Sequence, residues 1–507
     1  MKKFFALLPV MGLLFISCEE DDVTTETTTP EPEPVNYTSG SADFSTYVAV
    51  GNSLTAGFSD GALFRMGQEA SMPNMLATQF SLAGGGEFSI PFMNDDLGGM
   101  TLAGNPIASN RLILSFASLS PDDPKSRPSP VPVSGQGTTE ITNTLPGPFN
   151  NMGVPGAKSF HLLAEGYGNP QGVALGLANP YFARFASEPN ATILGDAAAQ
   201  QPTFFSLWIG NNDVLSYVAA GGDGQNQLGN LDPSTYGSND ITDPRVLGSV
   251  LQGILGTMTA NGAKGVIANI PDVTTIPYLT TVPHNPVPLD EATAALLNGA
   301  YAQYNGGLAQ LQQAGLISAE ELAQRTISFA AGEGNAVVIL DENLTDLTSF
   351  NPALVNMRQA TEEDLVVLPA SSFIGSLADP NNPTSINGVA IPLADKWVLT
   401  PEEQEEANTA MMAFNDVIKT IAEQFDIAFV DANALLTTLR TTGITLKDGS
   451  KVTADFGTGG GFSLDGVHPS PRGYAILANE FIRVINEKYG SNLPAVNPLD
   501  YTGLYIN

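Results

Sequence analysis

Short apolar runs that end in glycine and then in polar side chains constrain the fold of this chain most strongly. Residues 47–50 (YVAV) lead into 51–53 (GNS), and residues 204–209 (FFSLWI) lead into 210–213 (GNND). Such unbroken apolar runs are typical of strands that are buried on both faces of a parallel sheet, and glycine permits the sharp turn that follows. Because open α/β sheets bind ligands at the carboxyl ends of their strands, Ser53 is a candidate nucleophile.

Helical patterns lie between the candidate strands. An amphipathic helix is predicted over residues 247–260, and a third strand follows at 265–271. This alternation is what a doubly wound parallel sheet requires. The same patterns predict helices over 289–314, from residue 401 and from residue 471, and strands over 336–340 and 427–431. We therefore expect an α/β fold with three α/β/α layers around a central parallel sheet.

Two stretches interrupt this alternation. Residues from about 60 to 150 and from 348 to 397 are rich in Gly, Pro, Ser or Asn and lack clear periodicity. The chain has 507 residues, of which 51 are Gly and 36 are Pro, a composition that favours long loops. We expect one domain over residues 41–507 that carries these two stretches as large insertions.

The amino terminus has the layout of a secretory signal peptide. Lysines at positions 2 and 3 precede an apolar run over residues 4–16, which is too short for a stable membrane span. Residues 15–18 (FISC) resemble the lipobox of bacterial lipoproteins, which implies removal of residues 1–17 and lipidation of Cys18. The alternative is a signal peptide followed by an incidental cysteine. Residues 18–40, rich in Thr, Glu and Pro, are expected to form an extended tether.

The charge and the cysteine content of the chain indicate where it is located and which classes of partner it could bind. Acidic residues directly after Cys18 resemble the surface-export signal of Bacteroidetes lipoproteins, which implies an exported outer-membrane lipoprotein exposed at the cell surface and held there only by its lipid anchor. The net charge of -32 makes nucleic acid an unlikely partner, because phosphates would be repelled. Cys18 is the only cysteine, so no internal disulfide is expected. No metal or organic cofactor is expected either.

Only three histidines are available as a general base. His468 lies three residues after Asp465, on a loop that leads into the helix expected from residue 471. His161 and His284 have no carboxylate at a suggestive spacing, and we expect both to be structural or surface residues. The three are far apart in sequence, which argues against a zinc site.

A catalytic serine needs a base within hydrogen-bond reach, and the base needs a group that holds its tautomer. His468 and Asp465 can fill these two roles for Ser53. The oxyanion that forms during acyl transfer needs preorganised donors. Candidates are the backbone N–H groups of Ser53 and Gly156 and the side-chain amide of Asn212. Each of these turns could also be an ordinary connection between elements, since glycine, asparagine and serine are all turn formers.

Together, four segments resemble the SGNH or GDSL hydrolases. These are residues 51–54 (GNSL), 153–156 (GVPG), 210–213 (GNND) and 465–468 (DGVH), which occur in the order known for that family. The resemblance implies a flavodoxin-like sheet, with Ser53 as nucleophile, Gly156 and Asn212 as oxyanion donors, His468 as base and Asp465 as its orienting acid. Asn52 stands where the family usually has aspartate, and Gly153 competes with Gly156 for the glycine role.

The expected function is that of a lipid-anchored serine esterase or lipase that works through an acyl-enzyme. Its substrate would be an ester of a lipid or of an acylated glycan, and its activity should fall on acidification as His468 becomes protonated. The rival hypothesis is a catalytically inactive surface lipoprotein that binds a glycan or a partner. An α/β-hydrolase is disfavoured because residues 51–55 (GNSLT) lack the second glycine of the G-x-S-x-G motif.

Overall fold

The computed structural model describes residues 35–116, 128–382 and 384–506. The predicted signal peptide, Cys18 and most of the tether lie outside these residues. The compact unit begins at Tyr37, slightly before the expected boundary at residue 41. Its first residues are held by the carboxyl-terminal part, because the Thr38 N–H donates to Asn492 (2.6 Å) and the Ser41 N–H to the Tyr489 carbonyl (2.8 Å). Within the described ranges, no helix is long and apolar enough to cross a membrane.

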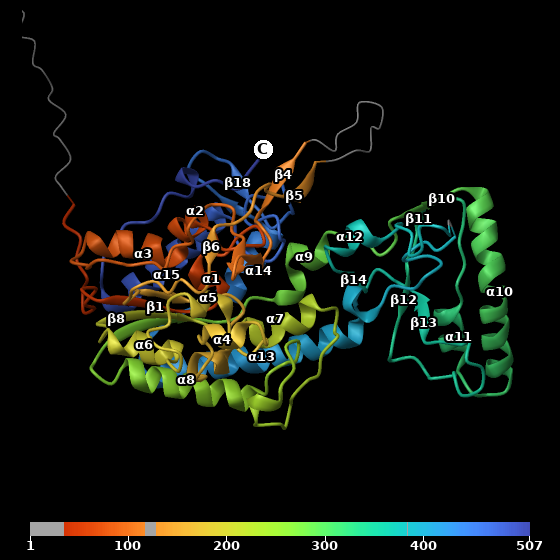
Figure 1. Cartoon of the computed structure of the whole chain (residues 1–507), viewed down its shortest axis with the longest axis horizontal. Coiled ribbons are helices and arrows are strands. Elements are labelled where there is room, and N and C mark those ends of the chain that lie inside the picture. Colours follow the sequence, from red (N-terminus) through yellow and green to blue (C-terminus); the bar gives the residue numbers. More distant parts are fainter. Residues whose placement is uncertain (1–34, 117–127, 383, 507) are drawn as a thin grey trace, which may run out of the picture. The chain divides into compact units, whose positions relative to one another are not determined.

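Five parallel strands form the central sheet (Figure 1). From one edge to the other they are β7 (Asn151–Gly153), β1 (Tyr47–Gly51), β8 (Phe204–Trp208), β9 (Lys264–Ala268) and β16 (Ala428–Val430). Counted in chain order within this sheet, the strands run 2-1-3-4-5, an order known from doubly wound folds. Gly51 pairs with Gly153 on one side and with Trp208 on the other, so the carboxyl ends of β1, β7 and β8 lie level.

Helices cover both faces of this sheet. On β1, Val48 and Val50 belong to one apolar cluster, whereas Tyr47 and Ala49 belong to another, as alternation along a strand requires. The first cluster includes buried side chains of α6 (Ile193–Ala199), α8 (Pro244–Met258) and α13 (Pro401–Gln424). The second includes those of α3 (Met72–Ser81) and α15 (Pro471–Tyr489). The predicted parallel α/β sheet is therefore confirmed, and the arrangement is compatible with three α/β/α layers.

The segment expected as the first insertion contains one helix of this core. α3 packs on the sheet through Met72, Met75, Leu76 and Phe80, although glycine-rich sequence follows it and hides its period. In its described residues, 60–116 and 128–150, the rest of the segment forms one short helix and five short strands. They are α2 (Arg65–Glu69), β2 (Met100–Leu102), β3 (Asn105–Pro106), β4 (Leu112–Ser115), β5 (Ser129–Pro132) and β6 (Thr139–Glu140).

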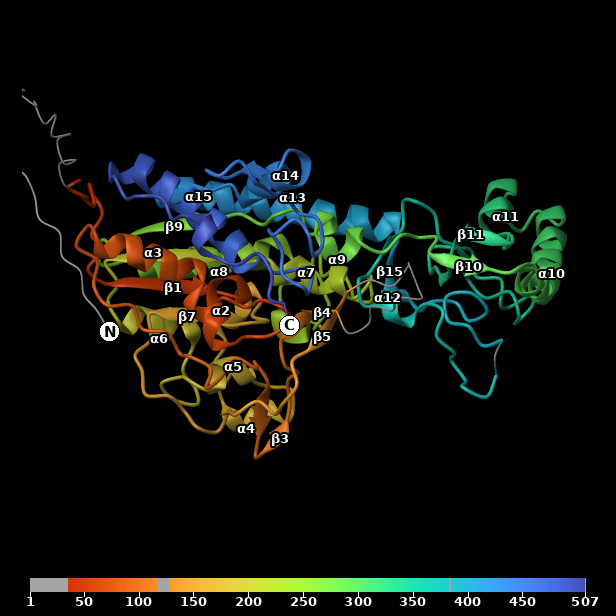
Figure 2. The same ribbon diagram turned by 90° about the horizontal axis from the view of Figure 1, so that it is seen from above.

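The second inserted region is larger than expected. The helix predicted over residues 289–314 is α10 (Glu291–Gln313), but Figures 1 and 2 both show it beside α11 (Ala319–Arg325) and away from the sheet. The strand predicted at 336–340 is β12 (Val338–Leu340), which pairs with β13 (Met357–Gln359) outside the central sheet. The same region contains β10 (Val287–Leu289), β11 (Gly332–Asn335), β14 (Leu365–Val366), α12 (Ala370–Phe373), η4 (Asp395–Trp397) and β15 (Val398–Leu399).

Side-chain caps mark the first residues of the two long helices α13 and α15. Glu403 reaches back to the Thr400 N–H (2.6 Å) at the start of α13, and Ser470 accepts from the Gly473 N–H (3.0 Å) at the start of α15. Both starts agree with the sequence pattern. The remaining elements are α1 (Ser53–Ala56), η1 (Ser159–Leu163), α4 (Pro170–Val173), α5 (Pro180–Ala183), α7 (Asn212–Ala219), η2 (Pro233–Thr235), η3 (Val273–Thr275), α9 (Pro277–Thr280), α14 (Ala432–Thr441), β17 (Ile444–Thr445), β18 (Lys451–Val452) and η5 (Pro498–Asp500).

Candidate active site

The turn after β1 is too crowded for any residue but glycine at its first position. A Cβ atom on Gly51 would lie 2.3 Å from the Trp208 carbonyl oxygen and 2.2 Å from Thr55 Oγ1. The next residue, Asn52, accepts a hydrogen bond from the Leu54 N–H (3.0 Å) and so caps α1. Ser53 therefore lies at the carboxyl end of a strand, as the sequence predicts, and it is also the first residue of a short helix, which the sequence pattern does not indicate.

Ser53, His468 and Asp465 lie in hydrogen-bond contact. Ser53 Oγ is 2.9 Å from His468 Nε2, and His468 Nδ1 is 2.9 Å from Asp465 Oδ2. In the tautomer with a proton on Nδ1, the imidazole can accept the serine proton at Nε2 while the carboxylate fixes the ring. These three residues come from opposite ends of the chain, and the structure brings them together as the sequence predicts.

The Asp465 carboxylate accepts more hydrogen bonds than the one from His468. Its Oδ1 accepts from the N–H groups of Val467 and His468 (2.8 Å each) and from Ser463 Oγ (3.0 Å), and its Oδ2 accepts from the Gly61 N–H (2.8 Å). Burial alone would raise the pKa of Asp465, but His468 and these donors outweigh it and lower the pKa to about 2. The carboxylate is therefore ionised at neutral pH.

The turn that supplies Gly61 was not identified from the sequence. Asp60 and Gly61 have left-handed backbones, with φ of 51° and 77°. The Asp60 N–H donates to Ser463 Oγ (2.9 Å), and Asp60 Oδ1 accepts from the Leu464 N–H (2.8 Å). Three hydrogen bonds thus connect this turn to the loop that carries Asp465. Its only sequence signal is an Asp-Gly pair, which is common to many turns.

The candidate oxyanion donors gather around the same strand ends. The backbone N–H groups of Ser53 and Gly156 donate to no other group among the described residues. Asn212 is the first residue of α7, and its side-chain amide donates to the Ala157 carbonyl (2.9 Å), which places it beside the Gly156 turn. The amide carries a second hydrogen that could serve a ligand.

The two competing glycines differ in surroundings. A Cβ atom on Gly153 would lie 2.3 Å from the Ala56 nitrogen, so Gly153 is needed for close packing of β7 against α1. Gly156 has φ of 81°, and a Cβ there would meet only Asn179 Nδ2, at 3.8 Å. The Gly153 N–H also donates to Asn151 Oδ1 (3.0 Å), whereas the Gly156 N–H has no acceptor among the described residues, so Gly156 is the glycine that could donate to a ligand.

Asn52 connects two strand ends. Its side-chain amide donates to Asn211 Oδ1 (3.1 Å), at the turn after β8. An aspartate at position 52 could not donate this bond, so the asparagine suits the orientation that Asn211 adopts here.

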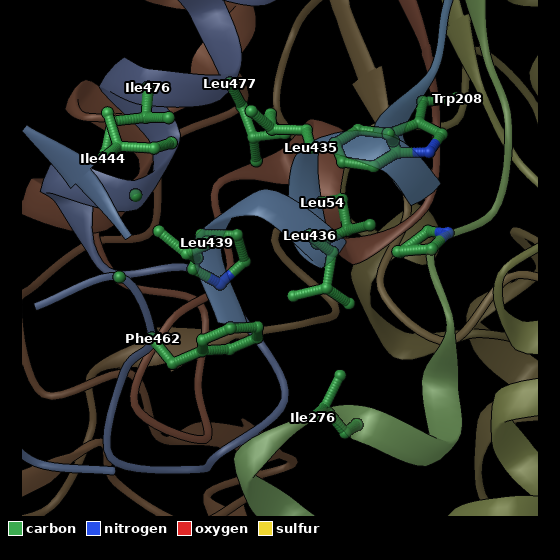
Figure 3. Close-up of a pocket in the computed structure, with 15 residues that line it drawn as sticks. Leu54, Trp208, Ile276, Leu435, Leu436, Leu439, Ile444, Phe462, Ile476 and Leu477 are labelled. Carbon is green, nitrogen blue, oxygen red and sulfur yellow. The ribbon is translucent and has the colours of Figure 1, made fainter. Parts of the chain in front are cut away.

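Figure 3 shows an apolar pocket of about 70 Å³ that is lined by sequence neighbours of Ser53 and His468, although neither of these two residues lines it. Leu54 and Pro469, which follow Ser53 and His468 in the chain, both line it. Trp208 also lines it, and its indole N–H is already bonded to the Asn269 carbonyl (3.0 Å). The other lining side chains include Leu436, Leu439, Phe462 and Ile476. A wall of this kind suits a hydrocarbon chain better than a polar group.

His161 has a structural role, as expected. Its Nδ1 accepts from the Lys158 N–H (3.0 Å), and its ring stacks on Tyr167. Burial, and then the charge of Lys158, lowers the pKa of His161 to about 4, so the ring is neutral. It has no contact with Ser53.

No family model, curated protein or solved structure matches this chain. The functional argument therefore depends on the geometry of the site.

Proposed function

We propose that this protein is a serine hydrolase of the SGNH type that cleaves carboxylic esters. The observation that carries the proposal is the pair of 2.9 Å contacts that join Ser53 to His468 and His468 to Asp465 at the carboxyl end of β1. The strand order, the order of the four sequence segments and the candidate donors beside Gly156 support it.

The mechanism follows from these positions. Ser53 Oγ attacks the ester carbonyl carbon while His468 Nε2 takes its proton, and the Asp465 carboxylate stabilises the imidazolium. The N–H groups of Ser53 and Gly156 and the amide of Asn212 stabilise the oxyanion, each by about 3 kcal/mol. His468 returns the proton to the departing alcohol, which leaves an acyl-Ser53 ester. Water, deprotonated by His468, then attacks this ester and releases the carboxylic acid.

The substrate that we propose is an ester with an apolar acyl chain, because the pocket beside Leu54 and Pro469 offers apolar walls. Residues 1–18 favour export and lipidation of Cys18. A lipid anchor there would bring the enzyme close to membrane lipids and surface glycans. Each step of this reaction is assigned to a side chain or a backbone N–H of the chain, so the proposal includes no metal and no organic cofactor.

Hydrolysis of p-nitrophenyl esters by the chain from residue 19 onward tests the proposal. We expect turnover of acetate to medium-chain esters, and a loss of at least about 10⁴-fold in kcat for Ser53→Ala, with unchanged thermal unfolding. Retained activity in that variant would exclude Ser53 as nucleophile. Absence of turnover of any ester by the folded wild type would favour the rival, a binding lipoprotein.

A further inference from the structure

Three carboxylates from separate segments meet far from Ser53 in the sequence. Glu342 follows β12, Asp395 lies in η4, and Glu403 lies in the first turn of α13. One carboxylate oxygen of each lies within 4.8 Å of the other two. We call these three residues the carboxylate cluster. It joins the second inserted region to a core helix.

Two oxygens in the carboxylate cluster are buried without a hydrogen-bond partner. Glu403 is only 3% exposed, and its Oε2 accepts from the N–H (2.6 Å) and Oγ1 (2.8 Å) of Thr400. Its Oε1, however, has no partner among the described residues, and neither does Asp395 Oδ1. A buried acceptor that stays unpaired costs about 1–3 kcal/mol, and more if it is charged. A cation bound to these two oxygens would remove this free-energy cost.

The backbone leaves room for this arrangement. Gly221 and Gly222, just after α7, have φ of 66° and 90°. A Cβ atom on Gly222 would lie 1.9 Å from Glu403 Oε1, so only glycine allows this carboxylate to stay in place. Two members of the carboxylate cluster, Glu342 and Glu403, line a cavity of about 410 Å³. Water and ions can reach the carboxylates from that cavity.

No basic side chain neutralises the carboxylate cluster. Among the described residues, no ion pair involves any of its three members. The neighbouring Arg358 is committed to Asp341 and Asp364, at 2.6 Å each. Burial and then the neighbouring carboxylates raise the pKa of Glu403 to about 8 and that of Asp395 to about 7.

We propose that the carboxylate cluster binds a calcium ion. Carboxylate oxygens are hard ligands that suit Ca²⁺, and the absence of nitrogen or sulfur donors in the set disfavours zinc. Ca²⁺ takes 6–8 oxygens at about 2.3–2.6 Å, which three carboxylates and waters from the open cavity can supply. Mg²⁺ requires stricter octahedral geometry and keeps more of its own water. The ion would fasten the second inserted region to α13.

Calcium titration of the chain from residue 19 onward, after EDTA treatment, tests the site without reference to ester hydrolysis. We expect saturable one-site binding by calorimetry. We also expect millimolar CaCl₂ to raise Tm by about 3 °C or more over MgCl₂ at equal ionic strength. No binding heat, together with equal Tm in both salts, would overturn the proposal.

Charge-matched variants separate this site from a general effect of the acidic surface. Glu342→Gln changes an exposed member of the carboxylate cluster, so it should fold, and we expect its Ca²⁺ affinity to fall at least 10-fold. Glu423→Gln makes the same charge change at an exposed position on the same helix as Glu403, about 30 Å along its axis, and should bind as the wild type does. Equal weakening in both variants would also overturn the proposal.

Discussion

Asp465 and Asp60 are two aspartates on neighbouring turns, the first partly buried and the second fully buried, and their pKa values shift in opposite directions. Asp465 accepts four hydrogen bonds besides the one from the His468 ring, and its pKa falls to about 2. Asp60 is 1% exposed and accepts one, from the Leu464 N–H, while its Oδ2 has no partner among the described residues. Burial, reinforced by the charge of Asp465, raises the pKa of Asp60 to about 7.

The comparison teaches that burial alone does not decide the charge of a carboxyl group. At Asp465 the charge of His468, and then the hydrogen bonds that the carboxylate accepts, outweigh the effect of burial, whereas Asp60 accepts one hydrogen bond and lies beside the charge of Asp465. The Ser59–Ala62 turn directs the Gly61 N–H to Asp465 and leaves Asp60 itself poorly solvated. The site thereby keeps its charge on the aspartate that contacts His468.

Substitution of each aspartate by asparagine should separate their roles most sharply. We expect Asp465→Asn to lower kcat on a p-nitrophenyl ester by about 10³–10⁴-fold, because an amide can hold His468 in the wrong tautomer. Asp60→Asn keeps an acceptor for the Leu464 N–H and should lower kcat by less than about 10-fold. Similar losses in both variants would mean that the two carboxyl groups act as one unit.

The pH dependence of stability should distinguish the two carboxyl groups next. Because the folded-state pKa of Asp60 is raised to about 7 from 3.8, the folded protein holds this proton more tightly than the unfolded chain does. The stabilisation that this bound proton gives the folded protein is complete below about pH 4 and is lost as the pH rises through about 7. We expect the free energy of unfolding of the wild type to fall by about 2–4 kcal/mol relative to Asp60→Asn over this range.

Urea unfolding of both proteins at several pH values measures this difference. Three charged groups act on Asp60: Asp465 raises its pKa, whereas Arg111 and His468 lower it. The variant is the control, because it lacks only the titrating group. Parallel stability curves would show that Asp60 does not titrate in this range.

Much of the sheet could be predicted because its signal is local. The apolar runs of β1, β8 and β9 and the caps of α13 and α15 each lie within a few residues of sequence. The position of α10 could not be predicted, since its periodicity indicates a helix but not which surface it packs on. α3 was overlooked because the glycine-rich sequence after it masked a short apolar stripe.

Some residues of the candidate site can also be predicted from local sequence, and others cannot. Ser53 follows an apolar strand that ends in glycine, and Asp465 and His468 precede a recognisable helix start, so their residue types and positions indicate the chemistry. Gly61 acts on a residue that is 404 positions away, and nothing in its own surroundings reveals that partner. The carboxylate cluster is likewise composed of single glutamates and aspartates from separate segments. Contacts of this kind become visible only when the chain is folded.

Removal of the Ser463 hydroxyl should give the smallest effect and sharpen the comparison further. Ser463 Oγ accepts from the Asp60 N–H (2.9 Å) and donates to Asp465 (3.0 Å), so it serves both turns. In Ser463→Ala a buried N–H loses its acceptor, and we expect the protein to be about 1–3 kcal/mol less stable. Because three N–H groups still solvate Asp465, kcat should fall only about 2- to 10-fold.

Ser59→Ala is the matched control, since the Ser59 hydroxyl is also buried but donates to the Pro469 carbonyl (3.3 Å) and contacts neither aspartate. It should lower stability and leave kcat unchanged. If Ser463→Ala lowered kcat as much as Asp465→Asn, the charge of Asp465 would depend on this single hydroxyl rather than on the number of its donors. If it left kcat unchanged, the three N–H groups alone would suffice to hold the carboxylate ionised beside His468.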